Sequence, residues 1–92
     1  MPTYTCSICG RKFDRGATII GTKVLCPDCG EEYDELIAEM IYDVLSEYLK
    51  NGKIDVESVL NKHKDKLKKF EKMKNRIKVM VIREVLREIG QR

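Results

Sequence analysis

The chain has 92 residues, 42% of them apolar and 36% charged, and a formal net charge of +3. This length accommodates one compact domain, or one core with a stapled minidomain, and it excludes a large multidomain enzyme. The apolar share is too high for a disordered chain but thin for a core without an additional staple, such as a bound metal ion.

The charge is distributed unevenly along the chain. The net charge is +2 over residues 1–30, −7 over residues 31–61 and +8 over residues 62–92. The small total therefore conceals an acidic segment followed by a basic one. We expect these two segments either to face each other or to bind separate partners.

The N-terminus, the apolar stretches and the cysteines of the sequence bear on where the protein is located. We see no signal peptide and no stretch approaching the roughly 18 apolar residues of a membrane span, so we expect a cytoplasmic protein with no membrane partner. In a reducing compartment, Cys-x-x-Cys pairs are more often metal ligands than disulfides. Trp is absent, Gln occurs once, and Lys, Glu and Ile are abundant, a composition that resembles that of thermophile proteins.

Residues 1–30 are predicted to form short strands and turns around two pairs of cysteines. Tyr4-Thr5 leads into the first pair. The runs 17–20 and 23–25 flank Gly21-Thr22, which is typical of a two-residue hairpin turn. We therefore expect a β-hairpin between the two cysteine pairs.

The four cysteines have the spacing of a metal site, because two Cys-x2-Cys pairs are separated by sixteen residues. Such a pair closes a tight knuckle around one ion, and a glycine follows each pair. We expect these glycines, Gly10 and Gly30, to adopt an unusual backbone conformation. Four thiolates suit tetrahedral zinc and leave no position for water or substrate, so a structural site is expected. The predicted ligands of one Zn²⁺ per chain are Cys6, Cys9, Cys26 and Cys29.

Residues 31–50 are predicted to form an acidic amphipathic helix. Apolar side chains recur every three or four residues from Tyr33 to Leu49, and Asn51-Gly52 ends the pattern. The acids at positions 31–35 open the helix, where they favour its dipole.

A second helical region is predicted from about residue 55 to about residue 90, with Asp55 as its N-cap. Near Val79 to Ile82 the apolar residues depart from the regular three- and four-residue spacing. One unbroken helix and two helices with a bend near Asn75 both fit this pattern.

The order of these elements resembles a known class of zinc finger. Knuckle, hairpin, knuckle and helix follow one another as in a treble clef, and the run GTKVLCPDCG at residues 21–30 resembles the end of a GATA-type finger. With the helical periodicity, this predicts a small α+β fold. A treble-clef-like zinc knuckle with four cysteine ligands and a β-hairpin at residues 1–30 would precede an α-helical body of two or three amphipathic helices at residues 31–92. Treble clefs bind DNA, RNA, proteins or no partner.

The sequences CSICG and CPDCG also resemble the paired knuckles of rubredoxin, which implies an iron ion held by four cysteines and electron transfer. Rubredoxins have a longer insert between the pairs and a core that includes Trp, whereas this chain has sixteen residues there and no Trp. Zinc is therefore the preferred metal. Iron stays the alternative, because four sulfur ligands accept either ion.

Basic residues concentrate between Lys62 and Lys78, where nine bases accompany two acids. A cationic amphipathic helix can lie along a phosphate backbone, so we predict nucleic-acid contact. Lysines act as point charges, which favours positioning on the backbone over base readout. The predicted phosphate contacts are Arg11, Lys12, Arg15, Lys62, Lys66, Lys68, Lys69, Lys72 and Arg76.

The basic face could instead complement the acidic helix. Glu35, Glu39 and Asp43 recur every four residues and would face bases across an antiparallel helix pair, within one chain or between two. The candidate partners are Lys62, Lys66 and Lys69. Met80-Val81-Ile82 broadens the apolar face near the C-terminus, which suggests a homodimer.

No catalytic constellation is apparent. His63 is a lone histidine on the apolar side, where we expect a packed or half-exposed residue, and no serine has a His/Asp partner pattern. The sequence therefore predicts a non-enzyme without a small-molecule substrate: a zinc-binding regulator, for example of transcription, associated with DNA or RNA. A zinc-stabilised protein–protein adaptor, with a homodimer as one form, is the alternative, and an iron electron carrier is a minor one.

Overall fold

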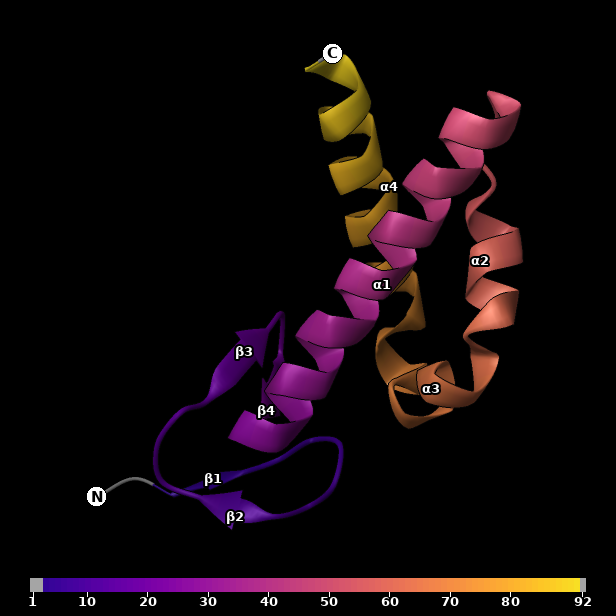
Figure 1. Cartoon of the computed structure of the whole chain (residues 1–92). Coiled ribbons are helices and arrows are strands. Elements are labelled where there is room, and N and C mark those ends of the chain that lie inside the picture. Colours follow the sequence, from indigo (N-terminus) through magenta and orange to yellow (C-terminus); the bar gives the residue numbers. More distant parts are fainter. Residues whose placement is uncertain (1–2, 92) are drawn as a thin grey trace. The chain divides into compact units, whose positions relative to one another are not determined.

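The computed structural model describes residues 3–91 of the chain (Figure 1). Within these residues it contains four short strands, four α-helices and one 3-10 turn. This confirms the predicted small α+β fold, with four α-helices where two or three were predicted. The chain divides into two compact units, residues 1–35 and residues 36–92. The long helix α1 (Pro27–Asn51) begins in the first unit and ends in the second.

The first unit holds two β-hairpins. β1 (Tyr4–Thr5) pairs antiparallel with β2 (Lys12–Phe13), and β3 (Thr18–Ile20) pairs antiparallel with β4 (Lys23–Leu25). Gly21, with a φ of 61°, lies in the turn between β3 and β4, which confirms the predicted two-residue turn. The sequence pattern does not predict the β1–β2 hairpin, because strands of two residues are too short to show an alternation.

Helix α1 begins before the predicted start at residue 31, inside the second cysteine pair. Pro27 occupies the first helical position, which its fixed φ and missing N–H favour. The helix ends at Asn51 as predicted. Gly52 has a φ of 72°, and its N–H donates to the carbonyl oxygen of Tyr48 at 2.7 Å.

The second unit continues with two short helices and one longer helix. They are α2 (Val56–Lys62), α3 (Lys64–Lys69) and α4 (Lys74–Gly90), and the 3-10 turn η1 (Glu71–Met73) separates the last two. The predicted N-cap is confirmed, because Asp55 Oδ1 accepts a hydrogen bond from the N–H of Ser58 at 3.0 Å.

The helical region breaks at His63 and again at Phe70. The predicted unbroken helix is therefore wrong. The two-helix form places its bend near Asn75, close to the break at residues 70–73, but it does not include the break at His63. The second break has a physical cause. Leu67, Phe70 and Met73 are all buried at intervals of three residues, and a 3-10 turn keeps side chains at this spacing on one face.

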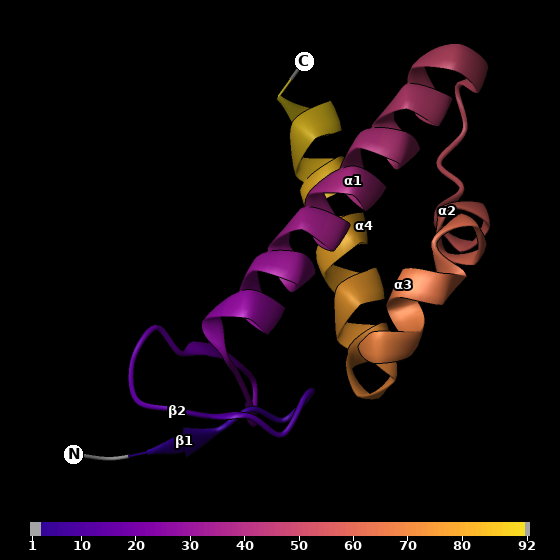
Figure 2. The same cartoon turned by 60° about the horizontal axis from the view of Figure 1, so that its bottom comes forward.

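The core of the second unit is built from one apolar stripe on each helix. On α4 the stripe is Ile77, Val81 and Val85, which recur every four residues and are fully buried. α2 runs back antiparallel to α1, and α4 packs against α2 (Figures 1 and 2). The other buried core side chains are Leu36, Ile37, Met40, Val44, Val56, Val59, Leu60, Leu67, Phe70 and Met73.

None of the helices in residues 3–91 combines the length and the apolarity that a membrane crossing requires.

Candidate metal centre and basic surface

The first cysteine pair forms a knuckle in which backbone N–H groups point at sulfur. The N–H groups of Ile8 and Cys9 donate to Cys6 Sγ at 3.4 and 3.5 Å. Two backbone hydrogen bonds close the knuckle, from the Gly10 N–H to the Cys6 carbonyl at 3.0 Å and from the Cys6 N–H to the Arg11 carbonyl at 2.8 Å. Gly10 has a φ of 76°, which confirms the predicted unusual backbone at this glycine.

Further hydrogen bonds attach this knuckle to β4. The Ser7 N–H donates to the Val24 carbonyl at 2.7 Å, and the Val24 N–H donates to Ser7 Oγ at 3.2 Å. Because β4 leads directly into Cys26, this attachment brings the two cysteine pairs together.

The second cysteine pair lies at the start of α1. Cys29 belongs to the first turn of the helix, where the Gly30 N–H donates to the Cys26 carbonyl at 2.8 Å. The predicted unusual backbone of Gly30 is wrong, since this residue is helical and has no positive φ. Gly30 instead permits a close approach between β3 and α1. A Cβ at Gly30 would lie 2.4 Å from Thr18 Oγ1 and 3.0 Å from Thr18 Cβ, so a glycine allows β3 to lie this close to the helix.

The four sulfur atoms form one cluster. They all lie within 4.8 Å of one another, and the Sγ atoms of Cys9 and Cys26 are 3.7 Å apart. In a tetrahedral zinc site, Zn–S bonds of about 2.3 Å place the sulfur atoms about 3.8 Å apart. A disulfide would need an S–S distance of about 2.05 Å. All four predicted ligands are thus brought together as free thiols at the dimensions of a metal site.

The surroundings change the acidity of two of these thiols. Burial opposes ionisation of Cys6, but hydrogen bonds from the N–H groups of Cys9, Cys26 and Ile8 lower the pKa of its thiol to about 6. Burial, together with the neighbouring cysteine sulfurs, raises the pKa of the Cys29 thiol. Cys6 can therefore meet a cation as a thiolate, whereas the cation has to displace the proton of Cys29.

The chemistry of this donor set is that of a structural metal. Four thiolates around one tetrahedral ion leave no position for water or substrate. Three of the four cysteines are buried and Cys9 is exposed, so the site is shielded on most sides. Zinc and iron both accept such ligands. The first unit therefore holds a four-cysteine site suited to a metal ion, and its second cysteine pair lies at the start of α1.

Three comparisons with known proteins found no match. No family model, no curated protein and no solved structure matches the chain.

The predicted phosphate contacts of the first unit lie at its surface. Arg11 Nη1 is 2.8 Å from Asp28 Oδ2, and Arg15 Nε is 4.0 Å from Asp14 Oδ1. Lys12 is exposed on β2. Exposed ion pairs of this kind contribute about 0–1 kcal/mol and exchange readily for other anions.

Two of the predicted contacts in the second unit face the acidic helix. Lys66 Nζ lies 3.0 Å from Glu39 Oε2, and Lys62 Nζ lies 3.8 Å from Asp43 Oδ2. Both acids belong to α1, so helix complementarity within one chain accounts for part of the basic segment. Glu35, the third acid predicted to take part, forms no ion pair with another described residue.

His63 is the centre of these contacts. It lies at the joint between α2 and α3, and 13% of its side chain is exposed, which confirms the predicted packing. Its Nε2 is 2.6 Å from Asp43 Oδ2, and its Nδ1 is 3.9 Å from Glu39 Oε2. The sequence gives no signal for this bond, because twenty residues separate the two partners.

Three of the predicted contacts have no acidic partner in the described part of the chain. Lys68, Lys72 and Arg76 are exposed, and none of them forms an ion pair with a residue in 3–91. Lys69, which is also exposed, has its Nζ 6.0 Å from the centre of the Phe70 ring. The structure thus divides the basic segment into cations that face α1 and cations that face solvent.

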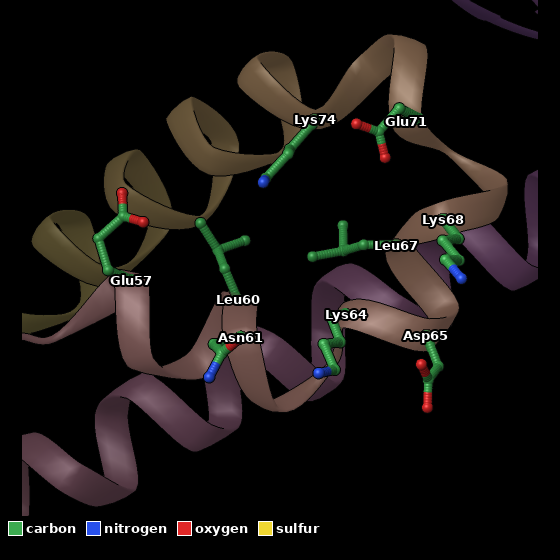
Figure 3. A pocket seen from close by; sticks show the side chains of 9 residues that line it. All are labelled: Glu57, Leu60, Asn61, Lys64, Asp65, Leu67, Lys68, Glu71 and Lys74. Atoms are coloured by element: carbon green, nitrogen blue, oxygen red, sulfur yellow. The ribbon is translucent and has the colours of Figure 1, made fainter.

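A hollow of about 540 Å³ lies between α2, α3 and α4 (Figure 3). Leu60 and Leu67 point into it, and Lys74 reaches over it. Three lysines and three acids line it, so the rim is balanced in charge and favours neither an anion nor a cation. The lining residues are Glu57, Leu60, Asn61, Lys64, Asp65, Leu67, Lys68, Glu71 and Lys74.

Proposed function

We propose that this protein is a small zinc-binding protein that associates with nucleic acid, DNA or RNA, by contacting phosphates. The observation that carries the proposal is the solvent-facing set of cations Lys68, Lys72 and Arg76, which we name the free basic face. These side chains come from α3, η1 and α4, and they are available to an external anion without breaking an ion pair.

Zinc supplies stability in this proposal and takes no part in a reaction. A tetrathiolate zinc centre contributes on the order of 10 kcal/mol of folding free energy in small fingers. The N-terminal unit needs such a contribution, because its buried side chains outside the cysteines are few, namely Phe13, Leu25 and Tyr33. The order of knuckle, hairpin, knuckle and helix supports assignment to the treble-clef class, and Cys29 lies in the first turn of the helix.

Phosphate contact by the free basic face is sequence-independent. Each lysine or arginine that neutralises a phosphate releases condensed counterions. Three such contacts on a duplex predict that the logarithm of the affinity falls with the logarithm of salt concentration with a slope of about −3. A role as a regulator, for example of transcription, would rest on this binding.

A titration of nucleic-acid binding tests the proposal. The zinc-loaded protein is added to a fluorescent duplex of about 20 base pairs and to a single strand of equal length, at several salt concentrations. The variant Lys68→Gln/Lys72→Gln/Arg76→Gln should lose most of the affinity and most of the salt slope. The matched control is Lys62→Gln/Lys66→Gln, which removes two cations that already face α1.

Two results would contradict the proposal. One is the absence of binding to either nucleic acid at low salt, and the other is an equal loss in the test and control variants. A zinc-stabilised protein adaptor is then the second candidate. It is favoured by the large apolar side chains that stay exposed on α1 and α4, among them Tyr42, Leu49 and Leu86.

A further inference from the structure

The four cysteines of the metal site differ in how open they are to solvent. Cys6, Cys26 and Cys29 are buried, whereas Cys9 is exposed. The next residue, Gly10, is exposed as well, and a Cβ at this position would have no neighbour within 4 Å. The first knuckle is therefore open at Cys9, so a small solute reaches this ligand more readily than the other three.

The hydrogen bonds at the site are distributed unevenly too. Cys6 Sγ accepts hydrogen bonds from the N–H groups of Ile8 and Cys9, at 3.4 and 3.5 Å. Within residues 3–91 no N–H group donates to Cys9 Sγ, which instead contacts Cys26 Sγ at 3.7 Å. A hydrogen bond stabilises the charge of a thiolate and makes its sulfur a weaker nucleophile. Cys9 thus combines access from solvent with a sulfur that no N–H group stabilises.

We propose that Cys9 is a peroxide-reactive thiol and that Cys26 resolves its oxidation, so that hydrogen peroxide converts the metal site into a disulfide between these two residues. This inference rests on the zinc centre proposed above. Oxidation-sensitive cysteines are accessible and often lie beside a resolving cysteine. The exposure of Cys9 and the 3.7 Å contact between its sulfur and that of Cys26 supply both features.

The reaction proceeds in two steps and needs no reactant besides the peroxide. The Cys9 thiolate attacks one oxygen of hydrogen peroxide, the O–O bond breaks, and a sulfenic acid and a hydroxide ion form. The Cys26 thiolate then attacks the Cys9 sulfur, so the S–S bond forms and the S–O bond breaks with loss of a second hydroxide. Two protons convert the hydroxides to water. The two cysteines together lose two electrons, which the peroxide gains.

Oxidation of this pair removes two of the four zinc ligands, so the site no longer holds the ion. Cys6 and Cys29 remain as thiols, and the first unit loses the stabilisation that zinc supplies. The second unit has an apolar core of its own, which includes Met40, Ile77 and Val81, so its helices should persist. Peroxide would therefore act on the four-cysteine unit and leave the free basic face in place.

A peroxide titration of the zinc-loaded full chain tests the proposal. Released zinc is measured with a chromogenic chelator against a sample without peroxide, and the remaining thiols are alkylated before the disulfides are mapped by mass spectrometry. We expect one zinc ion to be released for each disulfide formed, with Cys9 linked to Cys26 and with Cys6 and Cys29 alkylated. Most of the far-UV circular dichroism of the helices should persist. A dithiol reductant with added zinc should restore the site.

Two variants exchange one sulfur ligand for an imidazole. Histidine is itself a zinc ligand, so Cys9→His and Cys29→His both retain four possible ligands. We expect Cys9→His to release zinc more slowly than the unaltered protein by about tenfold or more, because its exposed ligand has no sulfur to oxidise. Cys29→His is the matched control, since it changes a buried ligand and keeps both Cys9 and Cys26. It should release zinc at about the unaltered rate. If either variant fails to bind zinc, the disulfide map of the unaltered protein decides alone.

Three outcomes would overturn the proposal. Disulfides between Cys6 and Cys9 or between Cys26 and Cys29 would show that a different pair reacts. Equal rates of zinc release in the two variants would show that the reaction does not begin at Cys9. Zinc that stays bound in an excess of peroxide would show that the site is closed to oxidation. Each of these results leaves the zinc centre and the phosphate contacts standing, whereas a protein that binds no zinc before peroxide is added would contradict the zinc centre as well.

Discussion

Replacing Gly30 by alanine tests how the second cysteine pair is built into the fold. Alanine is ordinarily the better helix residue, and in an open helical position this change stabilises by up to about 1 kcal/mol. At position 30 the added methyl group would lie 2.4 Å from Thr18 Oγ1 and 3.0 Å from Thr18 Cβ. A rotation of the threonine side chain relieves the first contact but not the second, because Cβ is fixed by the backbone.

The magnitude follows from these two opposing effects. Overpacking of a tightly packed site costs about 1–3 kcal/mol. Subtracting the gain in helix propensity leaves a net destabilisation of the four-cysteine unit of about 0–2 kcal/mol. Folding of this unit and metal binding are coupled, so the loss should appear as a zinc affinity that is weaker by up to about thirtyfold.

Competition with a chromogenic chelator measures this affinity directly. Gly90→Ala is the matched control, since Gly90 is also helical and a Cβ there has no neighbour within 4 Å. It should bind zinc as the unaltered protein does. Adding Thr18→Gly to Gly30→Ala should recover most of the loss of zinc affinity, because both Oγ1 and Cβ of the threonine are then absent, whereas Thr18→Ala should recover only the part due to Oγ1. If Gly30→Ala binds zinc as tightly as Gly90→Ala, the close approach of β3 to α1 is refuted.

Three further predictions concern the cap, the part-buried hydrogen bond between His63 and Asp43, and the metal ligands. Asp55→Ala removes the N-cap of α2 and should lower the free energy of unfolding by about 1 kcal/mol in urea titrations of the zinc-loaded protein. His63→Ala leaves the Asp43 carboxylate without its 2.6 Å partner and should cost about 1–3 kcal/mol in the same titration. Above about pH 6, the pKa of Cys6, this thiol is already ionised in the metal-free protein, so zinc displaces no proton from it. As the pH falls through about 6, zinc has to displace that proton too, and the logarithm of the zinc affinity should fall by one additional unit per pH unit.

Each of these predictions has its own control. Asn61→Ala changes an exposed residue of α2 that caps nothing, and a cost equal to that of Asp55→Ala would contradict the cap. Lys66→Ala removes an exposed ion pair and should cost less than about 1 kcal/mol, so a cost at or above that of His63→Ala would contradict the role of His63. The logarithm of the zinc affinity should change slope against pH near pH 6. A constant slope on both sides of about pH 6 would contradict the lowered pKa of Cys6.

The sequence predicts most of the metal knuckle because its signals are local. The two Cys-x-x-Cys pairs, the turn at Gly21 and the glycine after the first pair each specify a short stretch of backbone. The end of α1 at Gly52 and the N-cap Asp55 are equally predictable, since capping depends on one or two residues. The start of α1 has a signal too, in Pro27, which suits a first helical position.

The features that the sequence does not predict depend on contacts between distant residues. Gly30 owes its importance to Thr18, twelve positions earlier, and nothing near Gly30 indicates that neighbour. The bond between His63 and Asp43 likewise joins two helices. The segment that contains the breaks at His63 and Phe70 has no glycine or proline to mark them. The break at Phe70 arises because burying side chains three residues apart outweighs continuation of a regular α-helix.

Metal analysis of the protein purified without added metal tests most directly whether the four cysteines hold one structural zinc ion, as we propose. The protein should be expressed with zinc and iron both present, and its metal content and thiol reactivity measured together. We predict one zinc per chain, no visible absorption band, and four thiols that react with an alkylating reagent only after a chelator removes the metal. Iron with a visible band, or metal-free protein of which the thiols react equally with and without chelator, would contradict the claim.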